Sequence, residues 1–136
     1  MTTLPRTAAV PVVRTDFGDQ AAWDELRTVV TTPNEDDFVA AVEFVEDRAY
    51  ADLTIEQVTA LVSDDVGHPI LVVADRDALG AAGLPLLVVD LREQRGRAIR
   101  VVAAELWGIE NNLSLANMDF HEFADHLDGD GIFRGF

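Results

Sequence analysis

Short, almost unbroken apolar runs alternate along the chain with segments of helical spacing. Residues 70–74 and 86–91 are the clearest runs, and such runs are typical of strands buried on both faces of a sheet. The segment 92–97 contains Gly96 and lies between two apolar runs, which predicts a hairpin loop. Together the runs predict five strands, at residues 10–14, 38–45, 70–74, 86–91 and 99–103.

The first predicted helix covers residues 20–31. Trp23, Leu26 and Val30 recur at i, i+3 and i+7, so they share one face of a helix. Asp19 stands just before this segment as an N-cap residue, and turn-forming residues follow its end. We therefore expect an amphipathic helix between the first two strands.

Two further helices are predicted from capping boxes, in which an N-cap side chain is followed three residues later by Glu or Gln. Thr54 with Gln57 begins one helix, and Asp119 with Glu122 begins the other. Gly129 follows the second helix, where a C-terminal glycine belongs. The apolar residues after each box keep a helical spacing: Ile55, Val58, Leu61 and Val62, and then Phe120, Phe123, Ala124 and Leu127.

These elements predict an α/β fold with the order β-α-β-α-β-β-β-α. We expect a mixed sheet of about five strands flanked by three helices, in one domain that covers residues 1–136. If the first three strands are parallel, right-handed crossovers join them. Residues 113–115 are interpreted as a further short strand. The apolar end of the chain is expected to dock on the body through Ile132, Phe133 and Phe136.

The composition excludes several classes of catalytic chemistry. The 136 residues include no Cys, and all ten basic residues are Arg because no Lys is present. Without Cys there is no disulfide, thiolate nucleophile or Cys-ligated zinc, and without Lys there is no usual P-loop or Schiff base. The chain lacks a signal-peptide pattern and an apolar run of the roughly 18 residues that a membrane span needs. We therefore expect a cytoplasmic protein that uses no membrane and no cofactor.

The formal net charge of −15 is the strongest compositional signal. It repels phosphate backbones, so nucleic acid is not an expected partner. Residues 1–68 carry 14 acidic and 4 basic side chains, whereas residues 69–136 carry 11 and 6. Such acidity serves either solubility alone or the attraction of a basic partner protein. In the second case, the first half of the chain supplies most of the surface.

Two carboxylates follow predicted strands and are candidate metal ligands. Asp16 follows the first strand, and Asp75 follows the run 70–74 with Asp77 nearby. If both strands are parallel, their carboxyl ends lie at one edge of the sheet, where Asp16 and Asp75 can hold Mg²⁺. The alternative is that these residues only start loops or cap helices, which is a common role of Asp after a strand.

One segment, residues 105–120, concentrates side chains that can both pack and recognise a ligand. Its sequence is ELWGIENNLSLANMDF. Asn side chains bind polar ligands, but they also satisfy backbone groups in turns, so an irregular connection into the last helix is the alternative interpretation. The candidate ligand- or partner-binding residues are Trp107, Glu110, Asn111, Asn112, Ser114, Asn117 and Asp119.

The end of the chain contains ELWGIENNLSLANMDFHEFAD and then DGDGIFRGF. These stretches resemble the C-terminal signature of a family of small uncharacterised domains from high-GC bacteria. Earlier segments are similar to that family in the same order: VVRTDFGDQAAW, YADLTIEQ, ILVVADRDAL and LLVVDL. The resemblance covers nearly the whole chain and implies a self-standing domain from a bacterium. It implies no activity, ligand or catalytic residue.

Three functions are consistent with these features. The first is a protein-binding module of the inhibitor or immunity type, without catalytic activity, that contacts a basic partner protein. The second is a small carboxylate-dependent enzyme or ligand-binding protein that uses Asp16 and Asp75 or the segment 105–120. The third is a scaffold that forms a homodimer or belongs to a larger assembly. The net charge and the missing catalytic side-chain types favour the first function.

Overall fold

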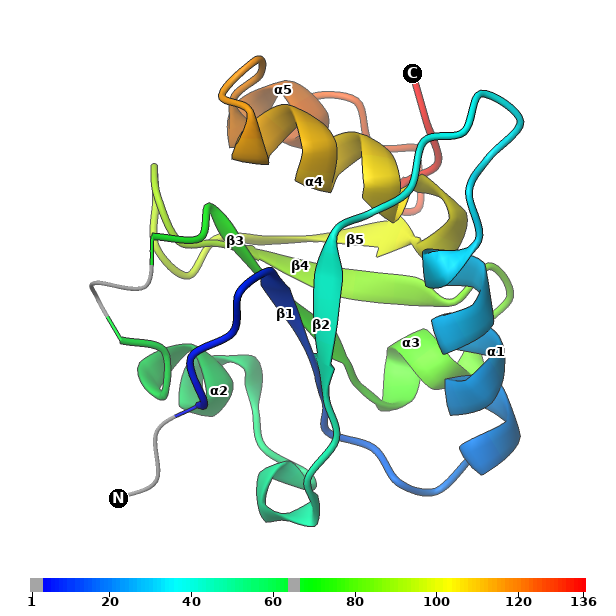
Figure 1. The fold of residues 1–136 in the computed structure, drawn as a ribbon, viewed down its shortest axis with the longest axis vertical. Coiled ribbons are helices and arrows are strands. Elements are labelled where there is room, and N and C mark those ends of the chain that lie inside the picture. The colour runs from blue at the N-terminus through cyan, green and yellow to red at the C-terminus, as the bar shows by residue number, and fades with distance from the viewer. Residues whose placement is uncertain (1–3, 64–66) are drawn as a thin grey trace.

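The computed structural model describes residues 4–63 and 67–136. Its strands are β1 (Val10–Arg14), β2 (Val42–Val45), β3 (Ile70–Ala74), β4 (Pro85–Asp90), β5 (Ala98–Val102) and β6 (Ile132–Phe133). Within the described residues, these six strands form one mixed sheet with the spatial order β2-β1-β3-β4-β5-β6 (Figure 1). β1 is parallel to both β2 and β3, an arrangement that the sequence had left open. β4 is antiparallel to β3 and β5, and β6 is parallel to β5.

Five α-helices and two short 3-10 helices surround this sheet in the described part of the chain. They are α1 (Gln20–Thr31), η1 (Arg48–Tyr50), α2 (Ile55–Ala60), α3 (Arg76–Gly80), η2 (Ala103–Glu105), α4 (Leu106–Ser114) and α5 (Phe120–Ala124). The predicted α/β class is confirmed, with one more strand and two more α-helices than expected. No described helix is long and apolar enough to cross a membrane.

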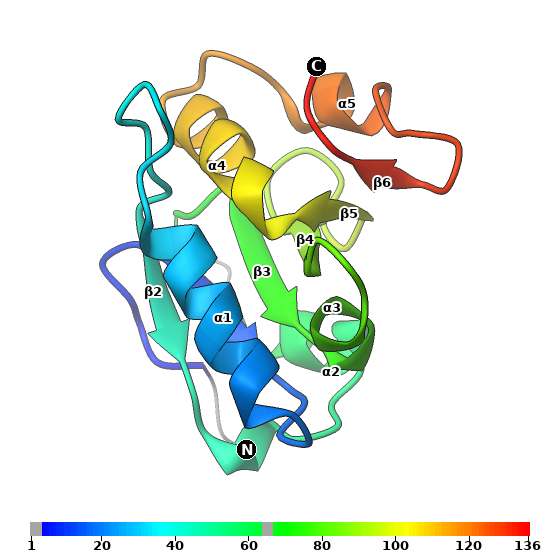
Figure 2. The same cartoon turned by 90° about the vertical axis from the view of Figure 1, so that its right-hand side faces the viewer.

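Two apolar clusters cover the two faces of the sheet. The larger cluster packs α1, α3, α4 and α5 against one face of β1, β3, β4 and β5. The smaller cluster packs α2 and Tyr50 of η1 against the other face. β1 and β3 are buried along their whole length because successive side chains of a strand point alternately into the two clusters. Figure 2 shows α1 and α4 on the near side of the sheet.

Several local predictions are confirmed at the level of single residues. Asp19 caps α1, where its side chain accepts a hydrogen bond from the N–H of Ala22. The capping boxes that begin at Thr54 and Asp119 are both formed. The end of the chain docks as predicted, because residues 132–133 pair with β5 as β6. These features depend on neighbours in sequence or on strong apolar patterns, so the sequence alone predicts them.

The predicted strand at residues 38–45 is wrong in its first half, because β2 contains only Val42–Val45. Asn34 Oδ1 accepts hydrogen bonds at 2.9 Å from the backbone N–H groups of Asp36 and Phe38, and Asp37 has a left-handed φ of 65°. These contacts turn the chain where a strand would extend it. Residues 34–39 therefore form a loop, which we call the acidic loop.

The segment 105–120 is mostly helical, so its interpretation as an irregular connection with a strand at 113–115 is wrong. α4 occupies most of it, and its buried residues Leu106, Ile109 and Leu113 recur at helical spacing. The polar residues between them masked this periodicity in the sequence. α3 was missed because five residues after the N-cap residue Asp75 are too few to show a period.

Candidate functional site

α4 lies between the acidic loop and the C-terminal tail, residues 132–136. Figure 2 shows the helix with the loop on one side, in cyan, and the tail on the other, in red. Side chains four residues apart lie on the same side of a helix. Trp107 and Asn111 contact the acidic loop, whereas Gly108 and Asn112 line a hollow against the tail, which Trp107 also lines. The candidate residues of the segment 105–120 therefore divide between two sides of one helix.

Glu110 is the polar centre of the side that faces the acidic loop. Only 3% of its surface is exposed. Its Oε1 accepts hydrogen bonds from the N–H of Ala41 at 2.6 Å and from Asn111 Nδ2 at 2.9 Å. Its Oε2 accepts a hydrogen bond from Ser114 Oγ at 2.6 Å. The buried carboxylate is thus satisfied by three donors, one of which belongs to the segment just after the acidic loop.

Asn111 and Trp107 attach the acidic loop itself to α4. Asn111 Nδ2 donates a second hydrogen bond to the carbonyl oxygen of Val39 at 3.1 Å. The ring of Phe38 stacks on Trp107, with centroids 5.1 Å apart and planes 11° from parallel. These candidate residues therefore hold another part of the chain, and their contacts give the acidic loop a defined position.

The acidic loop presents three consecutive carboxylates to solvent. Glu35, Asp36 and Asp37 are all exposed, and they are followed by Phe38 and Val39, which are 49% and 37% exposed. Figure 1 shows this segment leaving α1 and running past α4 into β2. The fold thereby joins part of the acid-rich first half of the chain to the candidate segment 105–120.

The remaining candidate residues of this segment bind backbone groups of their own neighbourhood. Asn112 Nδ2 donates to the carbonyl oxygen of Gly108 at 2.7 Å, and the carbonyl oxygen of Asn112 accepts from the N–H of Asn117 at 2.9 Å. The N–H of Asp119 donates to Glu122 Oε2 at 2.7 Å in the capping box of α5. These contacts shape the end of α4 and the start of α5.

Asp119 also belongs to a small group of potential metal ligands at the start of α5. One ligand atom each from Glu93, Asp119 and His121 lies within 4.8 Å of the others, and all three residues are exposed. Glu93 already accepts a hydrogen bond at 2.8 Å from the N–H of Phe120, and its other oxygen lies 3.5 Å from His121 Nδ1. Capping of a short helix accounts for this arrangement.

Asp16 and Asp75 line one hollow at the carboxyl ends of the parallel strands β1 and β3. The hollow has a volume of about 220 Å³ and is also lined by Asp52 and Asp77. The sequence did not single out Asp52, which reaches this edge because its N–H donates to the carbonyl oxygen of Thr15 at 2.7 Å. The parallel pairing of β1 and β3 therefore places the two candidate carboxylates at the same edge of the sheet.

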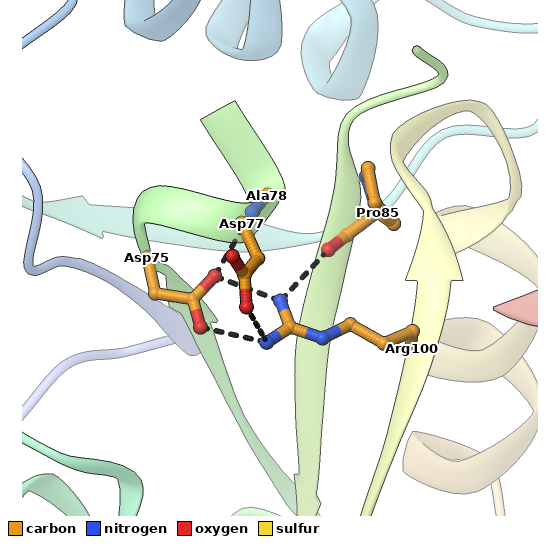
Figure 3. Close-up of polar contacts among 5 residues, drawn as sticks. All are labelled: Asp75, Asp77, Ala78, Pro85 and Arg100. Atoms are coloured by element: carbon orange, nitrogen blue, oxygen red, sulfur yellow. Dashed lines mark hydrogen bonds and ion pairs between the residues drawn. The ribbon is translucent and has the colours of Figure 1, made fainter. Parts of the chain in front are cut away.

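Arg100 of β5 engages both carboxylate oxygens of Asp75 (Figure 3). Its two terminal nitrogens lie 2.7 and 2.8 Å from Asp75 Oδ1 and Oδ2, and Oδ1 also accepts from the N–H of Ala78 at 3.0 Å. A metal ion bound by Asp75 would compete with this guanidinium. Among the described residues, neither Asp16 nor Asp75 belongs to a cluster of three potential ligands. A metal ion held by Asp16 and Asp75 stays a prediction.

A larger hollow lies on the tail side of α4. It has a volume of about 370 Å³, and Trp107 and Asn112 line it together with Glu105. The sequence did not single out Glu105 as a site residue. The feature of the sequence that could have indicated this hollow is the apolar end of the chain. The opposite wall consists of aromatic residues of α5 and of the tail: Phe123, Phe133 and Phe136.

Comparison with known families covers almost the whole chain. Residues 9–136 match the family described as Domain of unknown function (DUF6924). No curated protein matches the sequence. The match confirms that the chain is a member of an uncharacterised domain family. The chain belongs to the DUF6924 family of domains, whose function is unknown.

Proposed function

We propose that residues 1–136 form one protein-binding domain, of the inhibitor or immunity type, and that the acidic loop contacts a basic partner protein. One observation carries this proposal: the three exposed carboxylates of the loop adjoin the half-exposed ring of Phe38, and α4 fixes that ring in place. Aromatic residues are enriched at the core of protein interfaces, and polar residues form the rim around them. The carboxylates supply attraction to a basic surface.

The internal contacts of the acidic loop support this function. The N–H of Asn34 donates to the carbonyl oxygen of Phe38 at 2.9 Å, which closes the loop on itself. The carbonyl oxygen of Val39 and the N–H of Ala41 are then held by Asn111 and Glu110. A loop that is already ordered loses less conformational entropy when it binds. The buried carboxylate of Glu110 therefore serves binding indirectly, through the position of the loop.

The charge of the whole chain favours a basic partner over a second copy of the protein. Two copies with a net charge of −15 each repel one another, whereas a basic protein is attracted and steered towards the surface. Contacts between exposed charges weaken as salt is added, because the screening length falls to about 8 Å at physiological ionic strength. Binding through the acidic loop is therefore expected to decrease as the salt concentration rises.

The test compares two variants that remove the same number of charges. The loop variant carries Glu35→Gln, Asp36→Asn and Asp37→Asn; Asn at position 37 tolerates the left-handed backbone there. The control variant neutralises three exposed carboxylates on α1, on α2 and at the end of α5, none of which accepts a hydrogen bond from the described residues: Glu25→Gln, Glu56→Gln and Asp125→Asn.

Each immobilised protein is incubated with a lysate of the source cells at low and at high salt. We expect the wild type and the control variant to retain the same basic protein in stoichiometric amount, and the loop variant to lose it. A photo-crosslinking residue in place of Phe38 should form a covalent link to that protein, and one in place of Glu56 should not. Equal retention by the loop and control variants, or no stoichiometric partner at all, contradicts the proposal.

A further inference from the structure

The hollow on the tail side of α4, which we call the tail pocket, has the size of a small-ligand site. Its volume of about 370 Å³ lies within the range of about 300–1,000 Å³ that such sites occupy. One wall is α4 with Trp107, Gly108 and Asn112, and the other is the tail with Phe133 and Phe136. A methyl group built on Gly108 meets no heavy atom within 4 Å, so the absence of a side chain there leaves the pocket open.

Glu105 is the carboxylate of the tail pocket, and no described residue binds it. It precedes α4 but makes no hydrogen bond that caps the helix, and no described basic side chain pairs with it. Burial raises the pKa of this carboxyl above its ordinary value. Gly135, at a φ of 111°, lies so close that a Cβ there would be 3.4 Å from Glu105 Oε1. The tail therefore crowds this carboxylate without supplying a donor to it.

Arg134 also lines the tail pocket, but its guanidinium is already paired with two carboxylates. Its guanidinium binds Asp130 at 2.7 and 2.9 Å and Asp128 at 3.0 Å. These two carboxylates raise the pKa of Arg134, chiefly through their hydrogen bonds. The group of three residues carries a net negative charge, so it leaves the charge of Glu105 uncompensated.

Aromatic rings form most of the remaining wall. Phe123, Phe133 and Phe136 contact one another with centroids 5.2–5.3 Å apart, and Phe136 is 72% exposed at the mouth of the pocket. Trp107 stands on the opposite side, fixed by its stacking on Phe38. The faces of aromatic rings attract cations, and carboxylates attract them more strongly still.

We propose that the tail pocket binds an organic cation, an alkylammonium or guanidinium group, between the aromatic rings and the carboxylate of Glu105. A cation of this kind supplies the charge that Glu105 lacks and the apolar surface that the rings favour. The overall negative charge of the chain raises the local concentration of such ligands. This inference goes beyond the docking function of the acidic loop and does not depend on it.

The binding test uses choline and arginine amide as probes and follows the indole N–H signals of the protein by NMR. Trp107 lines the tail pocket and should report binding, whereas Trp23 is fully buried in the core and serves as an internal reference. We expect saturable shifts of the Trp107 signal with at least one probe. The neutral analogue of choline, in which carbon replaces the quaternary nitrogen, should bind about tenfold more weakly.

Two variants test the roles of the carboxylate and the rings. Glu105→Gln keeps the shape of the side chain and removes its charge, so the affinity should fall by about tenfold. Phe136→Ala removes an exposed ring from the pocket and should also weaken binding. Glu25→Gln makes the same chemical change on an exposed side chain of α1 and should leave the affinity unchanged. An unchanged Trp23 signal shows that each variant is folded.

The outcomes separate this proposal from the docking proposal. If neither probe shifts the Trp107 signal, or if Glu105→Gln binds as well as Glu25→Gln, the tail pocket is not a cation site, whatever the acidic loop does. If a probe binds equally to the wild type and to the acidic-loop variant, the two sites act independently.

Discussion

Two carboxylates, Glu110 in the middle of α4 and Glu105 just before it, differ in almost every respect. Glu110 is buried and receives three hydrogen bonds, whereas Glu105 is partly exposed and receives none from the described residues. Glu110 faces the acidic loop, and Glu105 faces the tail. Two glutamates five positions apart on the chain thus have different roles. Glu110 stabilises the fold on one side of the helix, and Glu105 has no hydrogen-bond partner among the described residues on the other.

This difference separates a structural role from a binding role. A buried carboxylate whose two oxygens both accept hydrogen bonds makes the local structure rigid. The loss of its side chain leaves the groups that donate to it unsatisfied. A carboxylate that accepts no hydrogen bond from the protein keeps its capacity to bind a ligand. The candidate segment therefore contains one residue that positions a surface and one that is available to a ligand, although both are glutamates in the same stretch of sequence.

Glu110→Ala should produce the largest effect on stability. It removes the acceptor of the Ala41 N–H and of the Ser114 hydroxyl, and one of the two acceptors of Asn111 Nδ2, so we expect the free energy of unfolding to fall by about 2–4 kcal/mol. Denaturant titration measures this change. Hydrogen exchange at Ala41 should accelerate at the same time. Glu110→Gln keeps an acceptor for Ala41 and should cost less, so an equal loss in both variants would argue against the hydrogen-bond explanation.

Glu105→Gln should affect ligand binding and leave stability intact at neutral pH. Because burial raises the pKa of Glu105, the folded state binds its proton more tightly than the unfolded state does. The stability of the wild type relative to the variant should therefore decrease as the pH rises from about 4.3, the ordinary value, through the raised pKa. Urea titrations at several pH values measure this trend. A wild type that gains relative stability over that range would contradict it.

The same raised pKa predicts how choline binding depends on pH. Protonation of Glu105 removes the charge that the cation needs, so the affinity should fall as the pH decreases through that pKa. The other charged or titratable groups here are Arg134 with its partners Asp128 and Asp130, and His126, whose ring packs on Phe136 at 4.9 Å. Choline titrations of Glu105→Gln should lack this dependence. If the variant shows the same profile as the wild type, another of these groups is responsible.

Gly108→Ala should change the stability less than Glu110→Ala does, and in the opposite direction. Ala is favoured over Gly in a helix by up to about 1 kcal/mol, and the added methyl group meets no heavy atom within 4 Å. We expect a gain of about 0.5–1 kcal/mol in the free energy of unfolding, measured by denaturant titration. Choline should still bind, with a modest loss of affinity as the pocket narrows. A destabilised variant would mean that the tail packs more closely on α4 than the structure has it.

Phe38→Ala should produce only a small effect on stability. The ring is half exposed and stacks only on Trp107, so we expect a loss of about 0.5–1 kcal/mol. Capture of the partner by the acidic loop should nevertheless weaken strongly, which a pull-down with the variant measures. If Phe38→Ala destabilises the fold as much as Glu110→Ala while capture is unchanged, the loop side of α4 has a structural role only.

The sequence predicted those parts of the site that depend on local pattern. The apolar runs placed Asp16 and Asp75 after two strands, and in the structure these strands are parallel neighbours with both residues on one hollow. The sequence also singled out Trp107, Glu110 and Asn111 as a group. It did not indicate what they contact, because Phe38, Val39 and Ala41 lie some 70 positions earlier in the chain. A contact of that separation leaves no periodic signal.

The sequence by itself determined the α/β class, the buried strands, the helix caps and the strong negative charge, because each follows from residue types and short-range spacing. Only the tertiary structure decided which carboxylates have a hydrogen-bond or ion-pair partner. Arg100 of β5 pairs with Asp75, the segment just after the acidic loop donates to Glu110, and the tail approaches Glu105 without binding it. Whether a polar side chain is satisfied depends on the partners that distant segments bring to it, and the packing of the sheet and helices fixes those partners.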